Sequence, residues 1–168
     1  MKKTGQWIIL MSLMTGMAMA GENRLGIGAH YWKTVDNVDV QDIQEDGLAY
    51  VLTYQRLLGD LFRLGLELEY YPDEFVGSTD AAYSPQAILT AGGGLYAGLG
   101  VGMGYYEDGW ADEPYFLLRG GLEIELLPGI YGDIHLNYRA ETFDDVTNAN
   151  EEIDTDVLTV GVAVRFDY

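Results

Sequence analysis

The residues able to carry acid–base or nucleophilic chemistry are few in this chain of 168 residues. It has two histidines, His30 and His135, and no cysteine, so thiolate catalysis, thiolate metal sites and disulfides are excluded. Beyond residue 20 the serines are Ser78 and Ser84. A hydrolase needs a nucleophile, a base and an orienting group within reach, and we expect Ser78, in a loop, to lie far from His135, in mid-strand.

A second candidate is a run of charged residues with alternating spacing near His135. In an extended segment Asp133, His135, Arg139 and Glu141 share one face. They could be drawn as an acid–base cluster, but carboxylates interleaved with arginine favour a structural ladder of ion pairs. The two histidines belong to segments that are not neighbours, which is weak support for a metal site. We therefore predict no catalytic residue, metal or cofactor, and no enzyme.

The segments that must position these residues show a period of two rather than 3.6. From Leu158 to Tyr168, for example, every second residue is apolar, which is typical of a strand. Several segments exceed the usual strand length of soluble sheets and suit tilted membrane strands. The predicted strands cover residues 24–33, 47–57, 61–71, 81–91, 94–106, 114–126, 129–142 and 156–168.

The connections between these strands alternate between short and long. Short turns rich in Gly and Pro lie at 58–60, 92–93 and 127–129. Longer polar loops lie at 34–46, 72–80, 107–113 and 143–155. Short turns at one end and long loops at the other are typical of an outer-membrane barrel whose termini face the periplasm. We predict an all-β fold, an eight-stranded antiparallel up-and-down transmembrane barrel.

Aromatic residues indicate that the apolar face meets lipid. Tyrosines end the apolar register of four strands at the long-loop end, as expected for a girdle at the bilayer interface. The predicted girdle consists of Tyr31, Tyr70, Tyr105 and Tyr138 at that end and of Phe62, Phe166 and Tyr168 at the other.

The polar face mixes both signs of charge and uses arginine, which suits a closed interior. The predicted lumen network comprises Arg63, Glu67, Glu69, Arg119, Glu123, Glu125, Asp133, His135, Arg139, Glu141, Arg165 and Asp167. Arg24 is left out of it. The same face carries Gly98, Gly100, Gly102 and Gly104, which we expect to leave room for side chains from across the lumen.

The N-terminus is predicted to be a cleavable signal peptide over residues 1–20. Lys2 and Lys3 precede an apolar run, and the stretch ends in Ala18-Met19-Ala20. An uncleaved interfacial anchor is the alternative. The barrel domain is expected over residues 21–168, and no later apolar run is long enough for a membrane-spanning helix.

The C-terminus carries the clearest family resemblance. The last residue, Tyr168, is aromatic and closes a run of alternating apolar residues that includes Phe166. This resembles the C-terminal signal that the barrel-assembly machinery recognises in outer-membrane proteins. Together with the signal peptide and the strand count, the chain resembles the small eight-stranded outer-membrane barrels of the OmpX/OmpA type. The resemblance implies the bacterial outer membrane as its location, and a monomer. It does not extend to the lipid A deacylases, because His135-Leu136-Asn137 lacks their His-x-Ser pair.

The net charge of −18 argues against a nucleic acid or other polyanion as partner, because such partners need a basic surface. Many of the acids fall in the long loops, where they keep the surface hydrated. They are also candidates for weak divalent cation binding that bridges to lipopolysaccharide. These loop acids are Asp36, Asp39, Asp42, Asp144, Asp145, Glu151 and Glu152. Phe75 and Trp110 are exposed apolar candidates for partner contact.

Three functions remain open from the sequence. The first is a non-enzymatic barrel with a structural or adhesive role through its acidic loops. The second is a narrow channel for small solutes beside the glycine row. The third is a soluble periplasmic barrel, similar to a lipocalin, with an apolar ligand inside.

Overall fold

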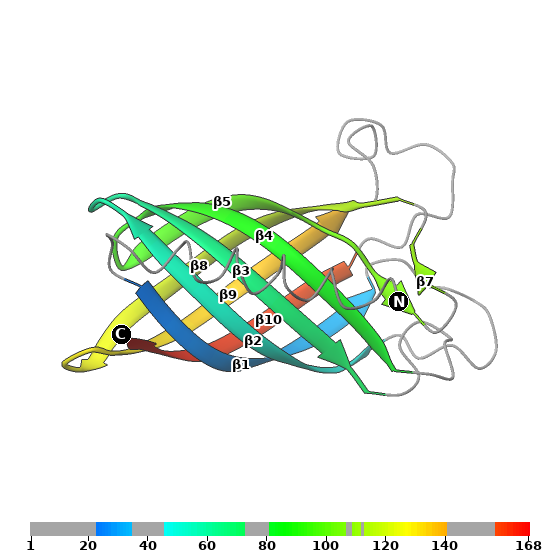
Figure 1. Ribbon diagram of the computed structural model, residues 1–168, viewed down its shortest axis with the longest axis horizontal. Coiled ribbons are helices and arrows are strands. Elements are labelled where there is room, and N and C mark those ends of the chain that lie inside the picture. The colour runs from blue at the N-terminus through cyan, green and yellow to red at the C-terminus, as the bar shows by residue number, and fades with distance from the viewer. Residues whose placement is uncertain (1–22, 35–45, 73–80, 107–108, 112, 141–156) are drawn as a thin grey trace, which may run out of the picture.

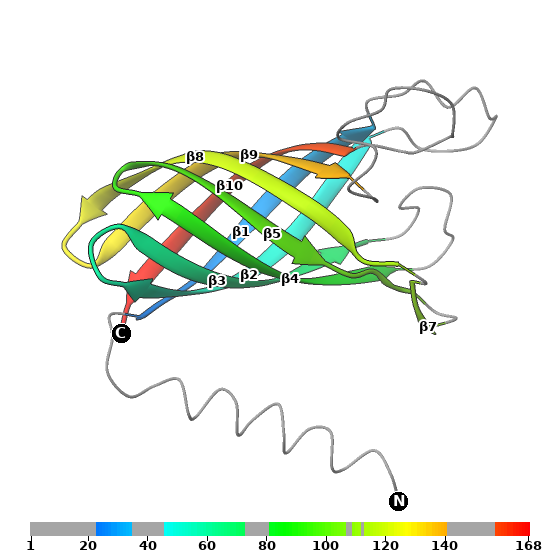
Figure 2. The same ribbon diagram turned by 90° about the horizontal axis from the view of Figure 1, so that it is seen from above.

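The computed structural model describes residues 23–34, 46–72, 81–106, 109–111, 113–140 and 157–168. They form one antiparallel sheet that closes on itself (Figures 1 and 2). The strands are β1 (Asn23–Thr34), β2 (Asp46–Leu58), β3 (Phe62–Tyr71), β4 (Ala82–Gly92), β5 (Leu95–Gly102), β6 (Tyr105–Tyr106), β7 (Gly109–Trp110), β8 (Tyr115–Leu127), β9 (Ile130–Ala140) and β10 (Val157–Asp167). Among the described residues no helix is long and apolar enough to cross a membrane.

Eight long strands make the wall of the barrel. Each pairs with its sequence neighbours, β5 pairs with β8, and the β1–β10 pair closes the ring. When the cross-strand partner of Arg24 is traced from strand to strand around the wall, the path returns to β1 at Thr34. The register of the closed sheet is therefore staggered by ten residues. Such a stagger tilts the strands and leaves an interior that side chains can fill. The predicted eight-stranded up-and-down barrel is confirmed.

The short turns lie where the sequence predicts them. Gly59 and Gly129 both have φ of 75°, and Gly92 has φ of 134°, conformations that residues with a side chain rarely adopt. These turns share one end of the barrel with the C-terminus (Figure 2). There the amide of Tyr168 donates to the carbonyl oxygen of Asn23 at 3.1 Å. The long connections 35–45, 73–80 and 141–156 and the predicted signal peptide lie outside the described residues.

The predicted strand 94–106 is wrong in one respect, because it is interrupted at Met103 and Gly104. The amide of Met103 donates to the carbonyl oxygen of Pro85 at 3.1 Å. In an antiparallel ladder such a pair exchanges two bonds, but proline has no N–H to return the second. The chain resumes as β6, which pairs with β4 through Tyr83 and Tyr105 and with β7 beyond it. The predicted loop 107–113 thus contains β7.

The two faces of the wall differ sharply in polarity. On β10, Leu158, Val160 and Val162 are exposed on the outside, while Thr159 and Arg165 are buried on the inside. The same alternation runs along the other long strands, with outward Ile27 66% exposed and outward Leu95 77% exposed. The apolar face therefore points outward and the charged face inward. This is the reverse of a soluble barrel with an apolar ligand cavity.

The missing ladder bond at Pro85 can be restored by mutation. Pro85→Ala supplies an N–H opposite the carbonyl of Met103, so we expect the new amide to be protected from hydrogen exchange as in the middle of a strand. The unfolding free energy should change by less than about 1 kcal/mol, because the gained bond and the freer unfolded chain oppose each other. Hydrogen exchange followed by NMR in micelles measures this. Pro128→Ala, in a turn, is the control. A new amide at position 85 that exchanges as fast as the new amide at position 128 would contradict the explanation.

Candidate functional site

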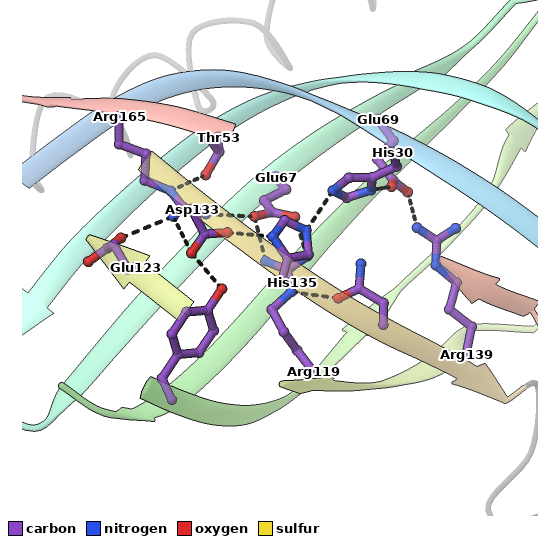
Figure 3. A network of polar contacts seen from close by, with 12 residues as sticks. His30, Thr53, Glu67, Glu69, Arg119, Glu123, Asp133, His135, Arg139 and Arg165 are labelled. Atoms are coloured by element: carbon purple, nitrogen blue, oxygen red, sulfur yellow. Dashed lines mark hydrogen bonds and ion pairs between the residues drawn. The ribbon is translucent and has the colours of Figure 1, made fainter. Parts of the chain in front are cut away.

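The interior of the barrel holds a network of buried charges drawn from strands on opposite sides of the lumen (Figure 3). Arg119 on β8 donates from both terminal nitrogens to the two carboxylate oxygens of Glu67 on β3, each at 2.7 Å. Its Nε donates to Asn137 Oδ1 on β9, also at 2.7 Å. Bidentate arginine–carboxylate pairs are among the strongest polar contacts in proteins. This pair therefore ties β8 to β3 across the lumen.

A second cluster surrounds the carboxylate of Glu123 on β8. Arg24 Nη1 lies 2.6 Å from it, Arg63 Nη1 3.0 Å and Arg165 Nη1 3.1 Å. Arg24 also contacts Asp167 at 2.9 Å, at the short-turn mouth. The exclusion of Arg24 from the predicted network was wrong, because Arg24 lies in β1 and is buried. The available signal was its alternation with His30 on the inner face of that strand.

Two imidazoles meet in the middle of the lumen although their strands are not neighbours. The Nε2 atoms of His30 and His135 lie 2.8 Å apart, and the rings are edge to face with centroids 4.8 Å apart. Each Nδ1 contacts a carboxylate, that of Glu69 for His30 and that of Asp133 for His135. The contact passes over Gly161 on the intervening strand β10, where a Cβ would come within 2.6 Å of His30. Spacing along the sequence gives no sign of this meeting.

The paired histidines are engaged by each other and by two carboxylates. No group of three or more His, Cys, Asp or Glu residues in the described part of the chain is arranged to hold a metal ion. Their Nδ1 atoms are already engaged by carboxylates, and each Nε2 faces the other. The chain from Glu69 through both imidazoles to Asp133 is thus a continuous polar bridge across the barrel. Its neighbours include Arg139, which contacts Glu69.

Inward tyrosines complete the network and were not predicted from the sequence. Tyr96 donates to Asp133 Oδ2 at 2.7 Å, and Tyr71 donates to Glu69 Oε2 at 2.8 Å. The hydroxyl of Tyr115 lies 2.5 Å from Ser84 Oγ. Tyrosines were expected to matter only on the apolar register. Tyr71 follows Glu67 and Glu69 in the polar register, which was the usable signal.

A small apolar cluster lies above the charged network, near the long-loop end. It comes from five strands and consists of Trp32, Ala49, Tyr71, Ala82 and Val157, all buried. Below it, a cavity of about 10 Å³ remains among Thr53, Gln55, Glu67, Thr90 and Arg119. A cavity of this size holds about one water molecule. Buried side chains from all eight long strands occupy the described lumen.

Nine of the predicted network residues are buried. The following are buried in the interior: Arg63, Glu67, Glu69, Arg119, Glu123, Asp133, His135, Arg139 and Arg165. Glu125 is exposed near the β8–β9 turn, where its Oε1 accepts from the amide of Gly129 at 3.1 Å. Glu141 lies outside the described residues, as do all the predicted loop acids and Phe75.

The glycines of β5 do not leave the room for side chains from across the lumen that the sequence analysis expects. Gly98, Gly100 and Gly102 do lie on the inner face, but the space beside them is filled from neighbouring strands. A Cβ on Gly98 would meet Thr90, and one on Gly100 would meet Ile88, both on β4. Tyr115 on β8 covers Gly102 in the same way. Side chains from across the lumen do not use this room.

The predicted girdle residues all lie on the outer face. Exposed members are Tyr31, Tyr105, Phe62, Phe166 and Tyr168, and half-exposed members are Tyr70 and Tyr138. Tyr31 donates to Asp46 Oδ2 at 2.6 Å, close to the long-loop end. Their contact with a bilayer interface stays a prediction.

The bidentate pair between Arg119 and Glu67 offers a direct test of the network. Arg119→Met leaves the carboxylate of Glu67 buried, with Arg165 at 3.7 Å as its remaining ion-pair partner among the described residues. We expect the unfolding free energy to fall by about 3–5 kcal/mol. The double variant E67M/R119M should lose much less, because no unpaired charge is left. Urea unfolding in detergent measures both, with the exposed E125Q as control. A double variant as unstable as the single one would contradict the pairing.

Comparison with solved structures places this architecture among known barrels. Neisserial surface protein A aligns with a TM-score of 0.58 at 12% identity, over 87% of this chain and 97% of that chain. Ail of Yersinia pestis aligns with a TM-score of 0.54 at 17% identity, over 89% and 100%. OprG of Pseudomonas aeruginosa aligns with a TM-score of 0.53 at 13% identity, over 88% and 96%.

No protein-family model matches the sequence, and no curated protein matches it. At these identities the structural likeness establishes the fold alone. The neighbours are outer-membrane barrels of the same strand number, and the apolar exterior found above is the surface that a bilayer requires. The chain is therefore an eight-stranded transmembrane β-barrel with the fold of the small bacterial outer-membrane proteins.

Proposed function

We propose that the protein is a non-enzymatic outer-membrane barrel that acts through the surface it presents at its long-loop end. The observation that carries this proposal is the filled lumen. The ion pair from Arg119 to Glu67 crosses the interior, and the pair from Arg165 to Glu123 passes over the intervening strand β9. An eight-stranded barrel of this kind has little interior space beyond its own side chains. The wall is then a scaffold, and function belongs to what the scaffold displays.

The filled lumen counts against the narrow channel. A solute would have to break the charged pairs and then pass the apolar cluster of Trp32, Ala49, Tyr71, Ala82 and Val157. The glycine row does not open a path, because Thr90, Ile88 and Tyr115 occupy it. Breaking a buried ion pair costs about 3–5 kcal/mol, which makes passage slow even for small ions.

The net charge of the chain bears on which class of partner the protein can bind. One structure of Ail contains the heparin analogue sucrose octasulfate and aligns here with a TM-score of 0.51 at 15% identity. The net charge of −18 disfavours such a polyanion in this protein. Divalent cations held by loop acids such as Asp36 and Asp144 would instead bridge the surface to lipopolysaccharide phosphates. The proposed state is a monomer that the barrel-assembly machinery inserts.

Conductance separates the proposed scaffold from a channel. We expect the purified barrel to give no discrete conductance steps in a planar lipid bilayer, because buried ion pairs lie across the described lumen. A variant with the network thinned, R119A/R165A, serves as the positive comparison, since it removes two arginines from the lumen centre. Regular steps from the unmodified protein would overturn the scaffold proposal and favour the channel.

Loop replacement tests where the function lies. Segments 35–45, 73–80 and 141–156 are exchanged for short Gly- and Asn-containing turns, and the β6–β7 hairpin is kept. The barrel should still fold, because the strand pairs and lumen contacts described above do not involve these segments, while attachment of cells to host or neighbouring surfaces is lost. Folding is followed by the shift in gel mobility on boiling. Attachment that survives in a folded variant, or a barrel that no longer folds, would contradict the proposal.

A further inference from the structure

A line of four buried side chains crosses the lumen from β3 through β1 to β9 (Figure 3). The carboxylate of Glu69 contacts Nδ1 of His30, and that of Asp133 contacts Nδ1 of His135. Between the two imidazoles the Nε2 atoms lie 2.8 Å apart, which leaves no room for a water molecule. Because all four residues are at most 2% exposed, the hydrogens in these three contacts belong to the four groups themselves.

The carboxylates at the two ends of this line act as hydrogen-bond acceptors. Glu69 is paired with Arg139, and Asp133 is paired with Arg165 at 3.1 Å. Each carboxylate also accepts a hydroxyl hydrogen from a tyrosine. Carboxylates held in this way are ionised, and an ionised carboxylate has no hydrogen to donate. Each one therefore requires a hydrogen on the Nδ1 atom that it contacts.

The number of hydrogens in the line does not match two neutral imidazoles. Three contacts in a row need three hydrogens, whereas two neutral imidazoles supply only two. With both of these on Nδ1, the Nε2 atoms of His30 and His135 would present lone pairs to each other at 2.8 Å, which is repulsive. With four hydrogens, two N–H groups would oppose each other at the same place. Only the state with three hydrogens makes every contact a hydrogen bond.

We propose that the bridge from Glu69 to Asp133 is a buried binding site for one proton, which His30 and His135 share between their Nε2 atoms. The carboxylates in contact with both imidazoles compensate the positive charge that this proton brings. The shared proton ties β1 to β9 above Gly161 on β10, where a Cβ would come within 2.6 Å of both rings. Release of the proton removes this tie, so the middle of the lumen responds to acidity. The inference concerns the lumen and is independent of the long loops.

Other charged and titratable groups face the bridge from the strands around it. The arginines among them are each bound to a carboxylate, and the tyrosines donate their hydroxyl hydrogens to the carboxylates of the bridge. The imidazoles are therefore the groups in this set whose charge changes near neutral pH. The surrounding groups are Glu67 and Tyr71 on β3, Tyr96 on β5, Arg119 on β8, Arg139 on β9 and Arg165 on β10.

NMR of the full barrel in detergent micelles, with isotope-labelled histidine, observes the shared proton directly. A hydrogen bond between two Nε2 atoms produces a scalar coupling between the two nitrogen nuclei, whereas facing lone pairs produce none. We expect the coupling between His30 and His135 to be absent at about pH 8 and to appear as the pH is lowered to about 5, the range in which histidine ordinarily takes up a proton.

Asp133→Asn supplies the third hydrogen without an added proton. Its amide nitrogen takes the place of Oδ1 and donates to Nδ1 of His135. Its oxygen takes the place of Oδ2, which accepts from Tyr96 at 2.7 Å and lies 3.1 Å from Arg165 Nη1. The hydrogen of the neutral His135 then sits on Nε2 and is donated to His30. We therefore expect D133N to show the coupling at both pH values.

Asp167→Asn is the matched control, because it makes the same chemical change at the short-turn mouth, where Asp167 contacts Arg24 at 2.9 Å. D167N should show the coupling at the lower pH only, like the unmodified protein. A coupling in the unmodified protein that is absent at both pH values, or equally strong at both, would overturn the inference. So would a folded D133N without the coupling, or a D167N that keeps it at about pH 8. The shift in gel mobility on boiling checks folding, and the unmodified protein decides the matter if D133N does not fold.

Discussion

The structure depends on pairing buried charges inside a closed wall. A carboxylate removed from water costs several kcal/mol unless cations and hydrogen bonds compensate it. The interior meets this requirement by placing Arg24, Arg63 and Arg165 around Glu123, and Arg119 on Glu67. Because the charged side chains pair with one another within the lumen, the outer face can consist of leucine, isoleucine and valine. An apolar exterior and a charged interior are therefore two consequences of one arrangement.

The same pairing supports the proposal that the barrel acts as a scaffold. Its contacts join strands that are not neighbours in the sheet, as in the bridge from Glu69 through His30 and His135 to Asp133. Such contacts add to the ladder of backbone bonds and occupy the axis along which a solute would move. The apolar cluster around Trp32 lies nearer the long-loop end. What remains for interaction is the outer surface and the long-loop end.

The two ends of the barrel differ in what they offer to a partner. The short-turn end is compact, with glycine turns at Gly59 and Gly129 and the C-terminal Tyr168 bonded back to Asn23. At the other end Pro85 interrupts the ladder, and the chain leaves the regular wall to form the β6–β7 hairpin. The hairpin thus presents exposed Trp110 at this end of the barrel.

The sequence by itself determined the strands, the turns and the two faces, because these follow from local properties. Alternating apolar residues from Leu158 to Tyr168, for example, indicate a strand. Turn conformations follow from glycine and proline within a few residues. The tertiary structure decided which inward residues meet. The stagger of ten residues around the ring brings Arg24 to Glu123 and His30 to His135, and no spacing along the chain encodes that stagger. The outward rings likewise become cross-strand partners only once β2, β3, β4, β6 and β7 are in register, because register is a property of the closed sheet and not of any one strand. These rings are Tyr50, Tyr70, Tyr83, Tyr105 and Trp110.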